Sequence, residues 1–140
     1  MAEAIEAFGV LVGRWTTEAT HPMIPGVVVR GDATIEWLEG EKFLIVRASN
    51  DHPQIPDSIS IIGDTDGMAM HYFDSRGVYR IYPTAMTDKG WEFWRDHPGF
   101  MQRFVGRFED GGDTIVGMSQ LNQDDKGFAD DLATTYRRAR

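Results

Sequence analysis

Short clusters of turn-forming residues recur along this chain at intervals of roughly ten residues, a spacing typical of all-β domains. Each cluster combines Gly, Asp, Asn, Pro or similar residues, which supply the backbone angles of tight turns. The clusters lie at 39–41, 53–57, 64–67, 74–77, 88–90, 96–99, 110–112 and 124–127. The runs between them are of strand length and rich in Val, Ile, Thr, Phe, Tyr and Trp, which favour pleated strands. The pattern therefore predicts a series of short antiparallel strands joined by hairpin turns.

The pattern predicts about ten strands and one helix. The strands are expected at 13–21, 27–38, 42–51, 58–63, 68–74, 77–86, 90–95, 100–108, 113–121 and 128–138. Residues 2–11 contain strong helix formers, and Ile5, Phe8 and Leu11 recur on one face of a short amphipathic helix. A flat sheet of this size would expose two edges and a large apolar face. We therefore predict an all-β fold, a closed antiparallel meander barrel with a short N-terminal helix, formed by residues 1–140 as a single domain.

The composition limits the partners and the location of the protein. A net charge of −8 argues against nucleic acid and membrane partners, because phosphate groups attract a basic face. The chain has no cysteine, which excludes disulfides and thiolate ligands. The N-terminus lacks the basic region of a signal peptide, and no apolar run approaches the roughly 18–20 residues that span a bilayer. We therefore expect a cytoplasmic protein.

Alternation of apolar and polar residues along three strands predicts which side chains face the barrel interior. The expected inward side chains are mostly apolar: Ala33, Ile35, Trp37, Phe100, Gln102, Phe104, Phe108, Phe128, Leu132, Thr134 and Tyr136. In 42–51, 68–74 and 90–95, apolar residues occupy both faces. The inward face of these three strands stays open at the level of sequence.

Two features at the ends of the predicted barrel resemble the calycin superfamily of lipocalins, fatty-acid-binding proteins and nitrobindin-like barrels. The first is Gly13-Arg14-Trp15 at the start of the first strand, and the second is Arg137-Arg138 at the end of the last. The resemblance implies that Trp15 plugs the closed end of the barrel. It also implies that Arg137 or Arg138 packs over this tryptophan.

Three further segments, 71–78, 91–95 and 98–104, are similar to an uncharacterised bacterial family of lipocalin-like proteins. The similarity extends over nearly the whole chain and implies a fold without a settled activity. Nitrobindin-like barrels hold haem through a histidine near the C-terminal end, whereas residues 98–140 contain no histidine. We therefore expect no haem, no other cofactor and no metal site.

Polar side chains among the aromatic residues of the middle strands are candidates for a ligand site. Arg80 and Tyr82 share one face of a strand, and a guanidinium on an inward face needs a carboxylate partner or an anionic ligand. Gln102 lies among phenylalanines and also needs hydrogen-bond partners. Alternatively, Arg80 is an exposed surface charge and Gln102 is purely structural. The residues expected to contact a ligand are Arg80, Tyr82, Gln102, Phe104, Trp94, Met118 and Trp37.

A catalytic alternative centres on His71 and Tyr72. If His71 faces the interior, its imidazole can act as an acid or a base, with Tyr72 or Arg80 polarising a substrate. If Met70 and Tyr72 face inward instead, His71 lies outside and the reaction has no base. The sequence leaves both orientations open, and with them the question of whether the protein is an enzyme.

Small-molecule binding is the leading hypothesis for function. The expected ligand is apolar or amphipathic, with a carboxylate as one option for the group that meets Arg80. The alternative is a cofactor-free isomerase, cyclase or hydratase that uses His71 inside the barrel. A barrel filled by side chains and a homodimer also stay open, and the sequence contains no motif of hydrolases, kinases or dehydrogenases.

Overall fold

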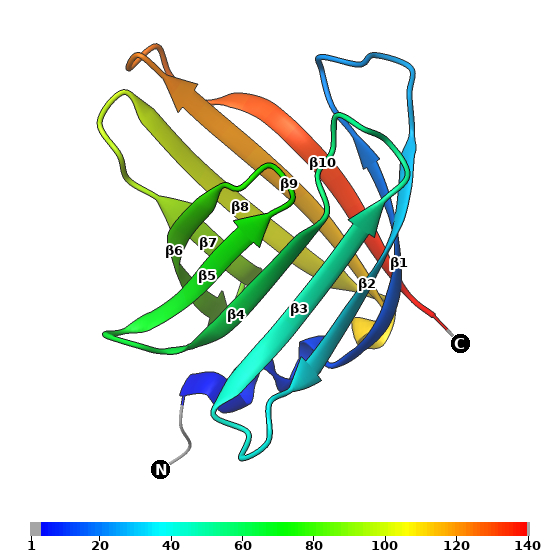
Figure 1. The fold of residues 1–140 in the computed structure, drawn as a ribbon, viewed down its shortest axis with the longest axis vertical. Coiled ribbons are helices and arrows are strands. Elements are labelled where there is room, and N and C mark those ends of the chain that lie inside the picture. The colour runs from blue at the N-terminus through cyan, green and yellow to red at the C-terminus, as the bar shows by residue number, and fades with distance from the viewer. Residues whose placement is uncertain (1–3, 140) are drawn as a thin grey trace.

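The computed structural model describes residues 4–139, which form ten antiparallel strands closed into a barrel (Figure 1). A 3₁₀ helix, η1 (Ala4–Leu11), precedes the barrel, and a 3₁₀ turn, η2 (Asp110–Gly112), connects two strands. The strands are β1 (Gly13–Thr20), β2 (Val29–Trp37), β3 (Phe43–Asn50), β4 (Ser58–Asp64), β5 (Met68–Asp74), β6 (Tyr79–Thr87), β7 (Gly90–Arg95), β8 (Phe100–Glu109), β9 (Thr114–Gln123) and β10 (Ala129–Arg138). The predicted all-β meander barrel is confirmed.

Each strand pairs with its neighbours in the sequence, and β1 closes the barrel by pairing with β10. On β1, Thr17 lies opposite Tyr136 of β10 on one side and opposite Gly31 of β2 on the other. Closure gives every described strand two partners, so no backbone edge is left open for pairing with another chain. This closed wall separates the interior face of the sheet from its exterior face.

The N-terminal helix forms one end of the barrel. It lies across the lower end in Figure 1, and Ile5, Phe8 and Leu11 are buried against the interior core. Their three-residue spacing matches the period of a 3₁₀ helix, in which such residues lie directly above one another. The predicted helix is therefore present from Ala4, in 3₁₀ rather than α form, while residues 2 and 3 lie outside the described part of the chain.

Trp15 and Arg138 complete this closed end. Trp15 is 1% exposed and its indole nitrogen donates to the carbonyl of Leu11 at 2.9 Å. The guanidinium carbon of Arg138 lies 4.2 Å from the centre of a Trp15 ring. Arg138 therefore fills the position implied by the calycin resemblance, whereas Arg137 points outward and donates to Glu18 at 3.1 Å.

The opposite, open end carries the connections that follow β1, β3, β5, β7 and β9 (Figure 1). The expected inward faces of β2 and β8 are confirmed, since Ala33, Ile35 and Phe104 are buried. In β5 the inward side chains are Met70 and Tyr72. The inward face of this strand therefore belongs to the two residues that flank His71.

The last strand departs from its expected alternation at one residue. Leu132, Thr134 and Tyr136 line the interior, but Phe128 lies outside, with the guanidinium of Arg103 3.8 Å from its ring centre. A register irregularity between Asp130 and Ala133 interrupts the two-residue alternation of β10. The grouping of Phe128 with the inward residues was therefore wrong. Among the residues described, no helix is both long and apolar enough to cross a bilayer.

Candidate functional site

The barrel interior contains a cavity with two connected lobes. The lobe named here after Arg80 has a volume of about 340 Å³, and the lobe named after Tyr136 has a volume of about 190 Å³. The residues that line both are Ile55, Pro56, Met70, Tyr72, Phe93, Phe104, Ser119 and Leu132. The volume of the Arg80 lobe is within the range of small-molecule sites, and the Tyr136 lobe adds to it. The open half of the barrel therefore contains space between its inward side chains.

Arg80, Tyr82 and Gln102 meet in the Arg80 lobe, so of the two orientations left open by the sequence Arg80 adopts the inward one. A guanidinium nitrogen of Arg80 donates to the amide oxygen of Gln102 at 3.4 Å, and the Tyr82 hydroxyl donates to the same oxygen at 3.3 Å. Arg80 also lies over Phe100, 5.4 Å from the ring centre. Within residues 4–139 no carboxylate pairs with Arg80. Among the described residues, the Arg80 guanidinium in this lobe therefore makes one hydrogen bond, and that bond is long.

The register of three strands brings these groups together. Arg80 and Tyr82 are two residues apart on β6 and so share its inner face. Gln102 lies on β8, on the other side of β7, where it pairs with Arg95. Phe104, two residues further along β8, stacks on Phe93 with ring centres 4.5 Å apart and planes 16° apart. A charged and polar patch therefore lies beside an aromatic wall.

Two glycines hold Phe104 in place. A Cβ atom at Gly117 would lie 2.6 Å from the Phe104 ring, and one at Gly106 would lie 3.0 Å from it. The ring therefore rests directly on the backbone of β8 and β9, where any larger residue would displace it. This packing fixes one wall of the cavity.

Tyr72 faces the cavity and is tied to the turn after β5. Its hydroxyl donates to Asp74 at 2.8 Å, and Arg76 donates to the same carboxylate oxygen at 2.6 Å. These Arg76 bonds, more than any other contact, hold the pKa of Asp74 well below its usual range. Burial and the bond to Asp74 raise the pKa of Tyr72 above its usual value. Tyr72 therefore stays protonated at neutral pH and cannot serve as a base there.

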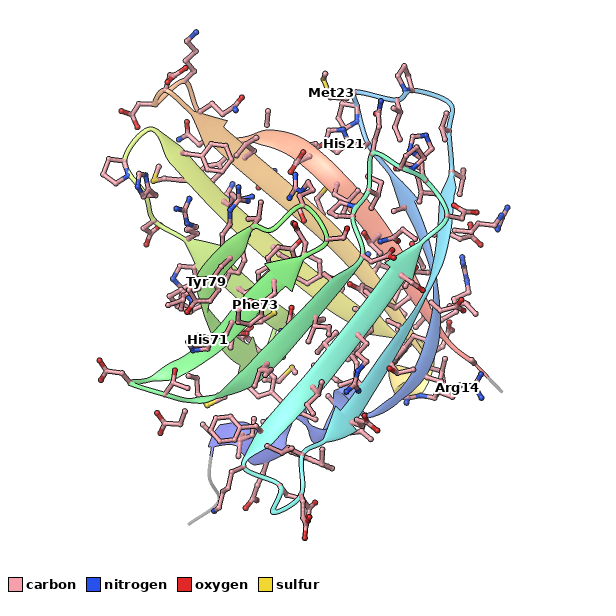
Figure 2. The ribbon with its side chains drawn as sticks, viewed as in Figure 1. Arg14, His21, Met23, His71, Phe73 and Tyr79 are labelled. Atoms are coloured by element: carbon pink, nitrogen blue, oxygen red, sulfur yellow. The ribbon has the colours of Figure 1, made fainter. Side chains whose placement is uncertain are left out.

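His71 lies on the outer wall, contrary to the catalytic alternative. Figure 2 shows it beside Phe73 and Tyr79 on the wall formed by β5 and β6. Its ring nitrogens bond to the hydroxyls of Thr65 at 3.0 Å and Tyr79 at 3.1 Å. Because Met70 and Tyr72 face inward, pleating places His71 outside. A reaction inside the barrel therefore cannot use His71 as its acid or base.

The histidine that does line the cavity is His21, at the open end (Figure 2). Its Nε2 lies 2.5 Å from a carboxylate oxygen of Asp131, and its Nδ1 accepts from the backbone N–H of Met23 at 3.0 Å. This contact joins the loop after β1 to β10. Sequence reasoning missed it because the two residues lie far apart in the chain and meet only when the barrel closes.

Three expected ligand contacts lie elsewhere. Trp94 pairs with Arg103 on the outer face of β7 and β8, and Met118 lies on the outer wall with 38% of its surface exposed. Trp37 packs at the closed end against η1, where a Cβ at Gly9 would touch its ring. The predictions for Trp94 and Met118 were wrong because these side chains are on the outer face of their strands. The prediction for Trp37 was wrong because this residue lies at the closed end, below the cavity.

Several cavity residues were not among the expected ligand contacts. They include an aromatic pair on β7 and hydroxyl-bearing residues on four other strands: Trp91, Phe93, Thr17, Ser60, Ser119 and Thr134. One usable signal was present. Thr17 lies two residues after Trp15, so placing Trp15 in the core also places Thr17 on the inner face.

No metal-binding arrangement of three or more His, Cys, Asp or Glu side chains occurs within the part of the chain that the structure describes. The cavity offers instead the Arg80 guanidinium, which has no carboxylate partner among the described residues, together with amide and hydroxyl groups and aromatic surface. Such a set can hold a ligand that has both an anionic group and an apolar or aromatic body.

Solved structures with the same fold were found at low sequence identity. Rv2717c from M. tuberculosis aligns with a TM-score of 0.70 and 15% identity, over 100% of this chain and 99% of that one. A DUF3598 family protein of unknown function from Nostoc punctiforme aligns with a TM-score of 0.61 and 11% identity, over 99% of this chain and 47% of that one. The S-type phycobiliprotein lyase CpeS from Guillardia theta aligns with a TM-score of 0.58 and 12% identity, over 99% of this chain and 94% of that one.

No protein-family model matches the chain, and no curated protein matches it. At these identities the structural similarity concerns the fold alone. The chain therefore shares its barrel fold with these three solved structures.

Proposed function

We propose that this protein is a small-molecule-binding barrel whose ligand is amphipathic and carries a carboxylate. The observation that carries the proposal is Arg80, which lines the cavity without a carboxylate partner among the described residues. A guanidinium placed in a partly buried site is stabilised by an anion that accepts its hydrogen bonds. The carboxylate of the ligand supplies that anion.

The neighbouring groups favour this arrangement. Arg80 and Tyr82 both donate to the amide oxygen of Gln102, so a carboxylate bound there has up to three donors around it. The other charged groups that line the lobe already have partners: Arg76 pairs with Asp74, Asp131 pairs with His21, and Arg103 donates to Gln120 at 2.7 Å and lies over Phe128. The ligand charge is therefore expected at Arg80 rather than elsewhere in the lobe.

The rest of the cavity suits the apolar part of the ligand. Phe93, Phe104 and Leu132 line both lobes and offer continuous apolar and aromatic surface. Burial of such surface contributes roughly 25 cal/mol per Å² of ligand removed from water. The phycobiliprotein lyase with the same fold acts, by its name, on phycobiliproteins, which is compatible with a barrel of this kind serving small-molecule chemistry.

A binding experiment tests the proposal directly. Laurate and biphenyl-4-carboxylate are titrated into the protein, and binding is followed by calorimetry and by the fluorescence of Trp91 and the other tryptophans. At least one of the two is expected to bind, and Arg80→Met is expected to weaken that binding about tenfold or more, because a charged hydrogen bond is lost.

Arg47→Met is the matched control. Arg47 lies on the outer wall, where it pairs with Glu36 at 2.6 Å, and its replacement should leave the affinity unchanged. Equal losses in the two variants would contradict a specific role for Arg80. Native mass spectrometry of freshly purified protein adds a second test, because a clean apo mass together with no uptake of either acid would overturn the proposal.

A further inference from the structure

The Tyr136 lobe contains hydroxyl groups that the protein itself leaves unused. The residues that carry them come from four strands: Thr17, Ser60, Ser119, Thr134 and Tyr136. None of their side-chain oxygens makes a hydrogen bond within residues 4–139. In a folded interior, hydroxyls are normally paired with protein groups or with ordered water.

Burial makes this group unusual. Thr17 is 7% exposed and Ser60 is 5% exposed. Every fully buried side-chain oxygen or nitrogen of the described residues has a hydrogen-bond partner, so an oxygen without a partner is not fully buried. The hydroxyls of these residues must therefore reach open space. Since both residues line the Tyr136 lobe, that space is the lobe itself.

The hydroxyls come from separate parts of the wall. Thr17 and Tyr136 are paired across β1 and β10, whereas Ser60 lies on β4, which is separated from β1 by two strands. Trp91 and Phe104 line the same lobe and meet edge to face with ring centres 5.4 Å apart. The lobe is thus lined by both aromatic rings and hydrogen-bonding groups.

We propose that the Tyr136 lobe binds an oxygenated aromatic ring, so that the ligand of this barrel is a hydroxylated or carbonyl-bearing aryl carboxylate rather than a plain fatty acid. The inference rests on the proposed function, because the carboxylate of such a ligand is held by Arg80 in the adjoining lobe. A methylene chain would displace water from the hydroxyls without replacing its hydrogen bonds, which disfavours it. A ring oxygen restores those bonds while the ring faces the aromatic walls.

The oxygen on the ligand is expected to be neutral. Burial raises the pKa of Tyr136 to about 12, so its hydroxyl stays protonated and donates. The lobe has no positive charge among its lining residues that could balance a phenolate. A phenol or a carbonyl fits this environment, and an ionised oxygen does not.

Two matched pairs of acids test the inference. The first pair is biphenyl-4-carboxylate and 4′-hydroxybiphenyl-4-carboxylate, the second is 3-phenylpropanoate and 3-(4-hydroxyphenyl)propanoate, and laurate is the chain reference. In at least one pair the hydroxylated acid is expected to bind about fivefold or more tightly than its partner and than laurate, the range set by one or two neutral hydrogen bonds.

The variants locate this preference in the lobe. Tyr136→Phe and Ser60→Ala remove unpaired hydroxyls and are expected to keep the fold. At least one of them should reduce the preference to less than about twofold, while the affinity for the unhydroxylated acid changes little. Tyr79→Phe is the matched control, because Tyr79 is 53% exposed on the outer wall and its loss should leave the preference intact.

The outcomes separate this inference from the proposed function. Equal binding within both pairs, lost in Arg80→Met, would overturn the inference and leave the function standing. The same holds if laurate binds most tightly, or if the preference survives both lobe variants. If none of the five acids binds, the proposed function and the inference fail together.

Discussion

Arg138 and Arg80 both face the barrel interior and both lie over an aromatic ring, yet their surroundings differ completely. Arg138 donates to Asp113 at 3.0 Å and to the carbonyls of Val12, Val10 and Gly112 at 2.7–3.1 Å. Arg80 donates once, to Gln102 at 3.4 Å. At the closed end, protein groups satisfy the guanidinium, while in the cavity its hydrogen-bonding capacity stays open.

The same difference separates the other polar groups of the two ends. The indole nitrogen of Trp15 donates to Leu11, whereas the hydroxyls of Thr17 and Tyr136, only two residues further from the closed end, have no partner among the described residues. A polar group without a protein partner costs stability unless water or a ligand engages it. The closed end is therefore organised for stability, and the cavity keeps its polar groups available for binding.

The largest difference is expected between the two variants in which one of these arginines is replaced by methionine. Arg138→Met should lower the free energy of unfolding by about 3 kcal/mol, because three carbonyls and Asp113 lose their donor. Arg80→Met should change it by less than about 0.5 kcal/mol, because little is lost. Urea unfolding followed by tryptophan fluorescence measures both, and similar losses would show that the two sites do not differ as described.

A smaller effect is expected at Asp74, which lies at the open end but is fully engaged, like the groups of the closed end. Its carboxylate has no exposed surface and accepts from Tyr72 and Arg76. Asp74→Asn should lower the stability at pH 7 by about 1–3 kcal/mol. We therefore expect the loss of stability to depend on whether the replaced group has protein hydrogen-bond partners, and not on the end of the barrel at which it lies.

The pH dependence of this loss follows from the depressed pKa of Asp74. The folded protein favours the carboxylate, so the contribution is complete above the ordinary aspartate pKa of about 4 and declines as the pH falls towards the lower pKa of the folded state. The difference between wild type and Asp74→Asn should therefore shrink between pH 7 and pH 3. A constant difference in urea midpoint would argue that the amide disrupts packing instead.

The smallest effect is expected at His71, on the outer wall. His71→Gln should leave the affinity for a bound carboxylate unchanged and alter the stability by less than about 0.5 kcal/mol, because its bonds to Thr65 and Tyr79 are exposed. Calorimetric titration of the variant checks this. A tenfold loss of affinity would mean that the outer wall communicates with the cavity.

Much of the candidate site was predictable where one face of a strand is clearly polar or apolar. Gln102 and Phe104 lie on an alternating strand, and both were placed correctly in the interior. Trp94 was misplaced because β7 carries tryptophans on both faces, so hydrophobicity cannot distinguish its inner side. Phe128 was misplaced because the irregularity in β10 has no mark in the local pattern.

Local chemistry determines the strands and turns of this chain, because turn residues and β-branched or aromatic runs act within a few neighbouring residues. The number of strands also favours a closed barrel, because a flat sheet of ten strands would leave two edges and a large apolar face exposed. The orientation of His71, the convergence of Arg80 with Gln102, and the unpaired hydroxyl of Tyr136 depend on register between strands that are distant in sequence. Register is set by the closing of the whole wall, so these features of the site exist only in the folded protein.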